Sequence, residues 1–283
     1  MGHAMLQDFD FDNDVEFTKL MARREDVQLA TAALELARDA YPNLNFAVTH
    51  DWIARRVAEI SSRIVHAAHD AEALGMVTAG LAVKHGLTGT REAYIQADGS
   101  YLNRVIETRH GIPISLSVLY MAVATGAGLH LQGVAAPGHF VTRYEALDGP
   151  LFVDAFAGGE VLDLDQMLLR VTLATGFSEE RALCVLEPAS NRTIIIRMLN
   201  NLKALYAQQE NWNAAWKVQH RLTALQPGSY EERRDLGLLS VKANRPGPAV
   251  DLLETCLKSA SKNEVSALES QLAEARRQLS QWN

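Results

Sequence analysis

The clearest structural signal in the chain lies in residues 113–156, PISLSVLYMAVATGAGLHLQGVAAPGHFVTRYEALDGPLFVDAF. The first part is a largely apolar run that predicts a buried helix, and Pro113 suits its first position, where no backbone donor is needed. Three short segments rich in β-branched and aromatic residues follow, namely LQGVAA, HFVTRYE and LFVDAF. Consecutive strands pair most economically as an antiparallel sheet. These residues therefore predict an α+β fold.

The residues before this stretch predict a mostly helical surrounding. Residues 15–40 are dense in helix formers and contain no Gly or Pro, so they predict one helix. Residues 49–74 predict a second helix, whose start Thr49 can cap. Recurrent glycines in residues 75–100 predict short helices and loops. The sheet is thus expected to be a small part of its domain.

Two further helices are predicted around the sheet. Residues 101–108 have a helical pattern that Gly111 interrupts. After the strands, Asp163 and Gln166 have the spacing of a capping box for a helix that runs to about Thr175. We therefore expect residues 1–190 to form a mostly helical domain with a small antiparallel sheet.

Beyond residue 190 the strand signals stop and a period of 34 residues begins. Equivalent positions are Leu202 and Leu236, Ala215 and Ala249, and Trp212 and Pro246. Helix pairs repeating every 34 residues are the tetratricopeptide pattern, although the second copy is degraded, with Ser240 in place of Tyr206. The last segment, 264–282, predicts a capping helix. We expect residues 191–283 to be an all-α repeat domain, with Tyr206 and Trp212 on its binding face.

Composition narrows the class of protein. The chain has 283 residues, a formal net charge of −7 and a mean hydropathy of −0.07, which indicates a globular protein of two domains. No apolar run is long enough for a membrane span, and no basic-then-apolar start indicates a secretory signal. The acidic balance argues against direct nucleic-acid binding. Two cysteines fit a reducing compartment, so we expect a cytoplasmic protein.

A candidate site lies where the predicted helix meets the strands. His139 and Asp154 fall on consecutive strands, and a His and an Asp so placed can form the base and orienting groups of a nucleophilic triad. The nucleophile would then come from the preceding helix. A buried structural histidine is the alternative interpretation of the same residues.

The motifs RHGIPISLS, PGHF and FVDAF, in that order, resemble the bacterial SirB-one family, and the likeness covers nearly the whole chain. The resemblance implies a transglutaminase-like, papain-like core, in which enzymatic relatives carry Cys on the helix, then His, then Asp. His139 and Asp154 take the second and third roles. In those relatives the cysteine lies about 15 residues before the Gly that ends the helix. Counting back from Gly128 gives Pro113, which has no nucleophile.

Other residues offer weaker nucleophiles. Ser115 is two positions from Pro113, so it points about 200° away, whereas Ser117 returns to within about 40° but one turn deeper. Both hydroxyls can equally bond within a buried helix. Cys184 and Cys256 follow Asp154 in the chain, in the reverse of the required order, and are expected to be small buried hydrophobic residues.

The start of this helix can bind without reacting. The amides of Ile114, Ser115 and Leu116, next to Pro113, are expected to be unpaired and to suit an anion or a carbonyl oxygen. Asn103 can add a side-chain donor. His66 and His69 share a helix face, but no Cys or carboxylate partner is evident, so we expect no metal site and no cofactor.

Three functions compete. The preferred one is a non-catalytic binding, adaptor or regulatory protein that engages a protein or peptide through its repeats. The second is a hydrolase or acyl-transfer enzyme that uses Ser115 or Ser117 with His139 as base. The third is a structural stabiliser of a larger assembly. We expect no membrane and no direct nucleic-acid partner, and the sequence leaves the oligomeric state open.

Overall fold

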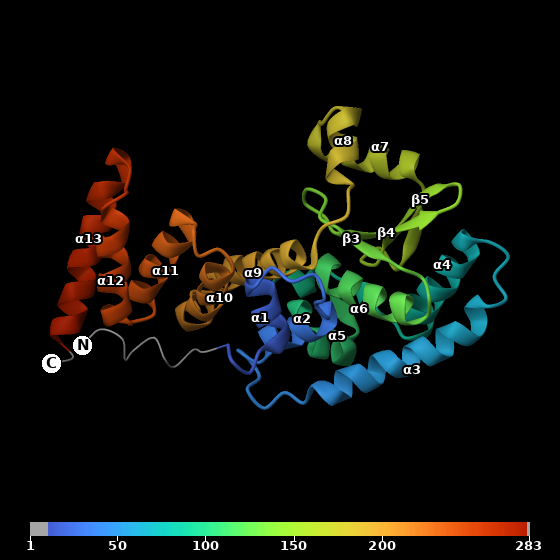
Figure 1. Cartoon of the computed structure of the whole chain (residues 1–283), viewed down its shortest axis with the longest axis horizontal. Coiled ribbons are helices and arrows are strands. Elements are labelled where there is room, and N and C mark those ends of the chain that lie inside the picture. The colour runs from blue at the N-terminus through green and yellow to red at the C-terminus, as the bar shows by residue number, and fades with distance from the viewer. Residues whose placement is uncertain (1–10, 282–283) are drawn as a thin grey trace. The chain divides into compact units, whose positions relative to one another are not determined.

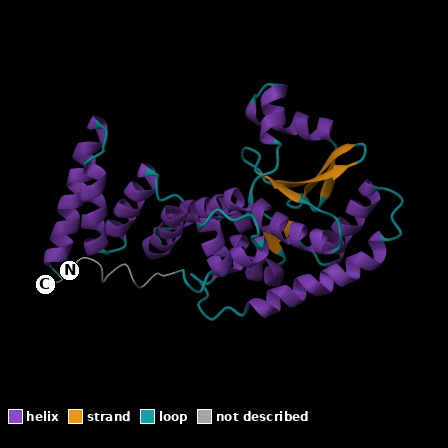
Figure 2. Cartoon of the chain, viewed as in Figure 1, coloured by secondary structure: helices purple, strands orange, loops and turns teal. Residues whose placement is uncertain are grey.

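A computed structural model of the chain describes residues 11–281 and divides them into two compact units (Figure 1). The core unit comprises residues 25–198, and the repeat unit joins the described residues up to Arg24 to those from Leu199 onward. Each is described by itself. Within the described residues, all strands belong to the core unit (Figure 2). The division falls inside one helix, α9 (Asn191–Gln208), so the expected domain boundary at residue 190 stays a prediction.

The core unit is mostly helical, as the sequence predicted. Its helices are α2 (Leu29–Ala37), α3 (Phe46–Ile64), α4 (Asp70–Thr78), α5 (Leu102–Thr108), α6 (Pro113–Gly126), α7 (Leu164–Thr175), α8 (Glu179–Val185) and the first part of α9. Residues 79–100 form short elements and loops, beginning with a π-helix at Ala79–Lys84. The predicted capping box of α7 is present, with Asp163 Oδ1 accepting from the Gln166 amide at 2.8 Å.

The sheet has the predicted antiparallel order. Strands β3 (Gln132–Val134), β4 (Val141–Ala146), β5 (Gly149–Asp154) and β6 (Glu160–Leu162) follow one another, each paired with the next. Strand β6 was not predicted from the sequence, because a strand of three residues is too short to show an alternating hydrophobic pattern. Two-residue strands β1 (Thr88–Gly89) and β2 (His110–Gly111) form a separate parallel pair.

Helix α6 is the centre of the core. It contacts α2, α3 and α5 as well as β3 and β4, and its residues from Pro113 to Tyr120 are all buried. A helix that is apolar all round must be covered on all sides, which explains why its sequence shows no polar face. Pro113 is the first residue of α6, as expected. Gly128, with φ of +98°, follows the helix C-cap at Ala127.

Two predicted helices are wrong in extent. The run 15–40 contains a break, because Arg23 adopts a left-handed backbone with φ of 56°, which separates α1 (Val15–Met21) from α2. The run 49–74 likewise splits into α3 and α4. Thr49 is not the cap of α3, since it is buried inside the helix and the side chain of Asn45 accepts from the Ala47 amide. Helix propensity does not register either break, because residues 22–28 and 65–69 contain no glycine or proline that would mark one.

The repeat unit has the predicted helix pairs. Besides α1 and the end of α9, it contains α10 (Trp212–Leu225), α11 (Tyr230–Lys242), α12 (Pro246–Leu257) and the expected capping helix α13 (Lys262–Ser280). Helices α10 and α12 begin at Trp212 and Pro246, the equivalent positions of the repeat. Ala215 and Ala249 are both fully buried, so small residues lie where adjacent helices pack closely.

Polar contacts join the helices of this unit. The indole Nε1 of Trp216 on α10 donates to Ser240 Oγ on α11 at 2.8 Å, and both side chains are buried. Helix α1 joins the array through α10, since Arg221 Nη2 lies 2.7 Å from Asp14 Oδ2 and its guanidinium lies 4.8 Å from the Phe17 ring centroid. Ser240 is thus an acceptor in the core of the array rather than a lost aromatic residue.

Candidate functional site

The structure brings His139 and Asp154 together. Strands β4 and β5 are antiparallel with Thr142 opposite Val153, so the residues before β4 lie beside the end of β5. Gly138, with φ of +70°, forms the turn that delivers His139 to this position. His139 Nε2 lies 2.8 Å from Asp154 Oδ2, with the imidazole 31% exposed and the carboxylate 6% exposed. The pair therefore has a buried acidic end and a basic end open to solvent.

The surroundings of Asp154 keep it ionised. Its Oδ1 accepts from the amides of Phe156 and Ala157 at 3.1 and 3.0 Å, and Arg170 Nη1 lies 3.5 Å from Oδ2. Burial acts to raise the pKa of this carboxyl, but the hydrogen bond and charge of His139, the Ala157 amide and Arg170 outweigh it and lower the pKa below its ordinary value. Arg170 is held in turn by Glu160, at 2.8 Å.

An ionised carboxylate fixes the tautomer of the histidine. Because Asp154 can only accept, the neutral imidazole of His139 carries its proton on Nε2, and Nδ1 keeps a lone pair. Among the described residues, Nδ1 has no hydrogen-bond partner. The main chain is also held, since Arg197 Nη2 donates to the His139 carbonyl at 2.8 Å. The arrangement presents one oriented acceptor at the surface, which can serve as a base or receive a hydrogen bond.

Aromatic residues line the neighbourhood of the pair. The ring centroids of His139 and Phe156 are 6.3 Å apart, and Phe156 lies 5.6 Å from the half-exposed Tyr94. The Phe156 ring fits only because residue 89 is glycine: a Cβ there would lie 2.0 Å from Phe156 Cδ2. Sequence reasoning missed Tyr94, Arg170 and Arg197, and only Phe156, inside the FVDAF motif, gave a signal.

The start of α6 differs from the expectation in one respect. Ser115 is fully buried, and its Oγ donates to the Gly99 carbonyl at 2.6 Å and lies 3.0 Å from the Ile112 carbonyl. Ser117 is also fully buried and its Oγ has no partner among the described residues. The prediction of a free Leu116 amide is wrong, because it donates to the Ile112 carbonyl at 3.2 Å, as the fourth residue of a helix does.

Two other expectations are corrected or refined. Asn103 on α5 is 8% exposed and its Oδ1 is buried without a partner among the described residues, so its expected role as a side-chain donor stays a prediction. Cys184 on α8 is exposed, so the expectation that it is buried is wrong, whereas Cys256 on α12 is buried as expected. His69 Nδ1 accepts from the Glu72 amide at 3.1 Å, which makes this histidine the cap of α4.

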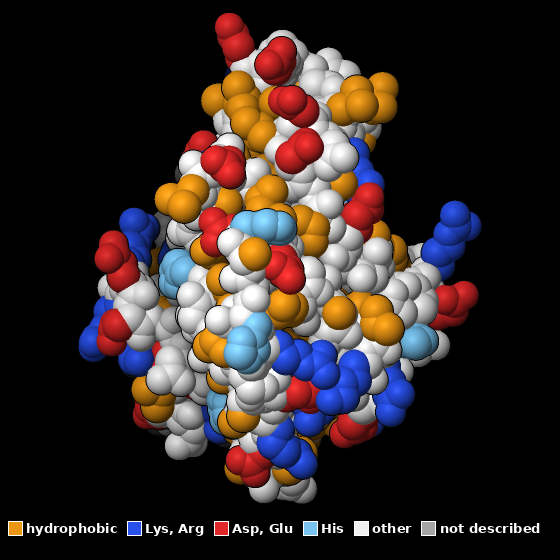
Figure 3. Space-filling view, turned by 90° about the vertical axis from the view of Figure 1, so that its right-hand side faces the viewer, with side chains coloured by type: hydrophobic (Ala, Val, Ile, Leu, Met, Phe, Trp, Pro, Cys, Tyr) orange, Lys and Arg blue, Asp and Glu red, His pale blue; other side chains and the backbone are white. Residues whose placement is uncertain are grey.

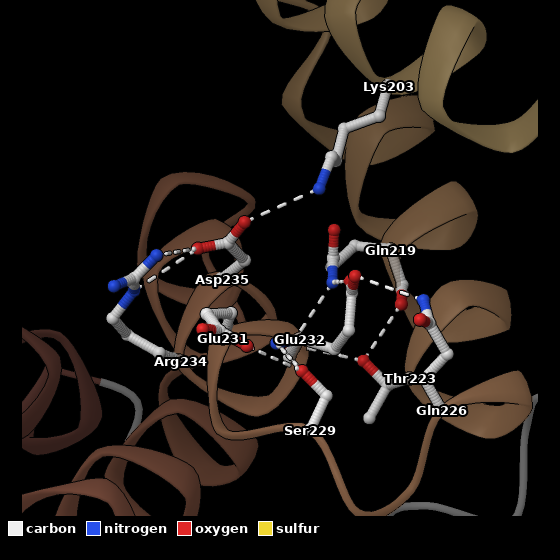
Figure 4. Close-up of polar contacts among 9 residues, drawn as sticks. All are labelled: Lys203, Gln219, Thr223, Gln226, Ser229, Glu231, Glu232, Arg234 and Asp235. Atoms are coloured by element: carbon white, nitrogen blue, oxygen red, sulfur yellow. Dashed lines mark hydrogen bonds and ion pairs between the residues drawn. The ribbon is translucent and has the colours of Figure 1, made fainter. Parts of the chain in front are cut away.

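The repeat unit carries a groove of about 1060 Å³ lined by residues of α9, α11 and α13 and by Trp212 at the start of α10. That Trp212 belongs to a binding face stays a prediction. Tyr206 does not line it and is 7% exposed, so its role on that face stays a prediction. The polar contacts between α10 and α11 are built on Gln219, whose Nε2 donates to Glu232 Oε2 at 2.6 Å (Figure 4).

A model of the transglutaminase-like superfamily matches residues 49–200, more than half of the chain. The chain belongs to the transglutaminase-like superfamily. A tetratricopeptide repeat model matches residues 202–279. The resemblance predicted from the motifs is thereby confirmed, as are the mostly helical fold and the C-terminal repeats.

Individual relatives agree with this assignment. A UPF0162 protein of Xylella fastidiosa (strain 9a5c) is 36% identical over 232 residues, 81% of this chain and 83% of that protein. Protein SirB1 of Salmonella typhimurium is 29% identical over 156 residues, 54% of this chain and 57% of SirB1. The mouse F-box only protein 21 is 28% identical over 54% of this chain but 24% of its own length. No solved structure matches the chain.

Two surface properties complete the description of this transglutaminase-like protein. Within residues 11–281, no helix is long and apolar enough to cross a membrane. On the face shown in Figure 3, acidic and basic side chains are interspersed, with the densest group of basic ones in the lower half. That face does not have the uniformly basic surface typical of nucleic-acid binding.

Proposed function

We propose that this protein is a non-catalytic adaptor, in which a transglutaminase-like core that has lost its nucleophile is joined to tetratricopeptide repeats that hold a protein partner. One observation carries the proposal: α6 begins with Pro113, and the hydroxyl of Ser115 in the same first turn is buried and donates to the Gly99 carbonyl. By the family resemblance the nucleophile belongs at Pro113, and proline has no group that His139 can activate.

The cysteines do not supply a substitute. Cys184 and Cys256 lie on α8 and α12, outside α6. Burial raises the pKa of the Cys256 thiol, which disfavours the thiolate that nucleophilic chemistry requires. Both are unpaired, which supports action in a reducing compartment such as the cytoplasm. The serine enzyme considered from the sequence is disfavoured because Ser115 Oγ already donates to the Gly99 carbonyl and because the Ser117 hydroxyl is fully buried inside α6.

In this proposal the remaining polar groups of the core recognise a ligand without reacting with it. His139 offers Nδ1, and the amides of Ile114 and Ser115 at the start of α6 offer donors for a carbonyl or carboxylate oxygen. Asn103 contributes its unpartnered Oδ1. Tetratricopeptide repeats are protein-interaction modules, which supports a protein as the partner of the other unit.

The proposal is tested with covalent probes. Purified full-length protein is treated with a fluorophosphonate and with iodoacetamide, and labelled residues are mapped by mass spectrometry in the wild type, His139→Ala and His130→Ala. His130 is an exposed histidine of the same unit, so it is the matched control. We expect no label on Ser115 or Ser117, and labelling of the cysteines that does not depend on His139. A label on either serine that is lost in His139→Ala and kept in His130→Ala overturns the proposal.

A further inference from the structure

The groove of the repeat unit is mostly apolar. Its lining includes alanines and leucines from the first helix of each pair, namely Ala204, Ala207, Leu238, Leu239, Ala267 and Leu268. Its volume of about 1060 Å³ lies at the upper end of the roughly 300–1,000 Å³ typical of small-molecule sites. Alanines on α9 and α13 leave room for a close approach by another chain. The apolar lining, spread over several helices, suits the side chains of a protein segment.

Most of the charge in the groove is balanced within it. Lys203 Nζ lies 3.3 Å from Asp235 Oδ2, and Arg234 Nη2 lies 3.0 Å from Asp235 Oδ1 (Figure 4). Arg234 also reaches Glu264 on α13 at 2.7 Å. These four side chains form one connected network across α9, α11 and α13, so they do not select the charge of a partner strongly.

Lys242 is the exception. It is exposed at the end of α11, and its Nζ lies 3.9 Å from the ring centroid of Trp212. Among the described residues it has no carboxylate within ion-pair distance. The Lys242 ammonium lies over the indole and can still donate hydrogen bonds to an occupant. The charges of Lys203 and Arg234 are balanced by Asp235 and Glu264, so Lys242 leaves this end of the groove with one positive charge in excess. An occupant with an acidic group here is favoured.

The conformation of the occupant follows from the walls. All four walls are helices, whose backbone groups are paired internally, and the groove offers no strand edge. An extended segment would have to replace its backbone hydrogen bonds to water with bonds to the polar side chains of the lining, such as Asn263 and Gln271, whereas a helix brings its backbone already paired. Apolar side chains at helical spacing can then occupy the leucine-lined floor.

We propose that this groove binds an amphipathic helix of a partner protein, with an Asp or Glu beside the apolar face that pairs with Lys242. The inference rests on the proposed adaptor function and adds the class of partner. Trp212 forms the wall against which the end of the helix packs, and Leu238 and Leu239 form the floor. Lys242 sets the orientation, because it supplies the unbalanced charge at one end.

Selection from peptide libraries tests the proposal. The full chain is panned against two displayed libraries, one of helical peptides with a fixed apolar face and random flanking positions, the other of extended, proline-rich peptides. The Leu238→Asp variant, which places a charge in the floor of the groove, is panned against the same libraries as the control. We expect helical peptides with an acidic flank to be enriched on the wild type and not on Leu238→Asp. Enrichment of extended or basic peptides, or no enrichment above Leu238→Asp, overturns it.

Binding of the most enriched peptide is then measured by fluorescence anisotropy. Lys242→Glu is expected to raise the Kd about tenfold, because attraction becomes repulsion at a desolvated contact. Lys258→Glu makes the same charge change at an exposed position outside the groove and should leave the Kd within about twofold. Equal effects of the two variants on the Kd refute the proposal that Lys242 orients the bound helix. Circular dichroism confirms that each variant is folded.

Two further results are distinguishable. If light scattering shows that the chain dimerises and that Leu238→Asp abolishes the dimer, the occupant is a second copy and this inference is wrong. An extended peptide held in the groove contradicts the helical partner but leaves the adaptor function intact. A His139-dependent serine label contradicts the adaptor function and leaves the groove unaffected.

Discussion

Replacing Glu59 with glutamine should weaken the core unit in a pH-dependent way. Glu59 on α3 accepts from Lys84 Nζ at 2.5 Å and lies 2.9 Å from His85 Nε2, so it ties α3 to the end of the π-helix. The hydrogen bonds from Lys84 and His85 exceed the opposing effect of burial and lower the pKa of Glu59 from 4.5 to about 2. The charged form is therefore favoured in the folded protein.

The size of the effect follows from this shift. The difference between 4.5 and about 2 corresponds to roughly 3 kcal/mol of preference for the ionised form. Lys84 is 50% exposed, and measured exposed pairs contribute about 0.2–1 kcal/mol because solvent screens them. We expect Glu59→Gln to lose about 1 kcal/mol at pH 7. Because the folded pKa is the lower one, this stabilisation is complete above about pH 4.5 and lost as the pH falls through about 2.

Urea unfolding at pH 7, 4 and 2.5 measures this, followed by circular dichroism and by tryptophan fluorescence, to which Trp52 contributes with its ring centroid 6.2 Å from that of His85. The difference between wild type and Glu59→Gln should shrink as the pH falls. Glu92→Gln, at an exposed carboxylate of the same unit, is the control and should change stability little at any pH. A loss that is the same at pH 7 and pH 2.5 refutes the reasoning, since it would then arise from shape rather than charge.

Two further substitutions test the packing. Ser240→Ala should destabilise the repeat unit by about 1–3 kcal/mol in urea unfolding, because it removes the hydroxyl that accepts from the buried indole of Trp216, and a loss below about 0.3 kcal/mol would contradict this. Gly89→Ala should cost about 1–3 kcal/mol and shift the NMR signals of the Phe156 ring, since the new Cβ overlaps that ring. Gly75→Ala, with nothing within 4 Å of its Cβ, is the control and should be neutral or stabilising.

The sequence predicted those parts of the fold whose signal is local. Pro113 at the start of α6 and the 34-residue spacing of Trp212 and Pro246 both reflect short-range rules of helix starts and repeats, and both are confirmed. The break at Arg23 was missed because its left-handed backbone falls on an arginine, a residue type that does not mark a helix end. Strand β6 was missed because three residues carry too little pattern.

The site was predictable only in part. His139 lies just before β4, not on a strand as expected, and Asp154 ends β5, so the antiparallel pairing of these two strands brings them together. Arg170 and Arg197 reach the pair from helices α7 and α9, through contacts that depend on side-chain direction and the packing of distant segments. The hydrogen bond of the Leu116 amide was predictable, because this amide lies four residues after Ile112, the residue that caps α6.

The packing of α11, α12 and α13 gives the array a modular length. Helix α12 contacts α11 on one side and α13 on the other, and α13 reaches no further than α11 among the strong contacts of the described helices. Stability in such an array is a sum of terms within each pair and between neighbours. A 34-residue cassette inserted before α13 would therefore meet the same two surfaces that α12 and α13 already offer each other. The recognition surface can be lengthened in this way while the His139–Asp154 pair stays unchanged, so the two units can evolve at different rates.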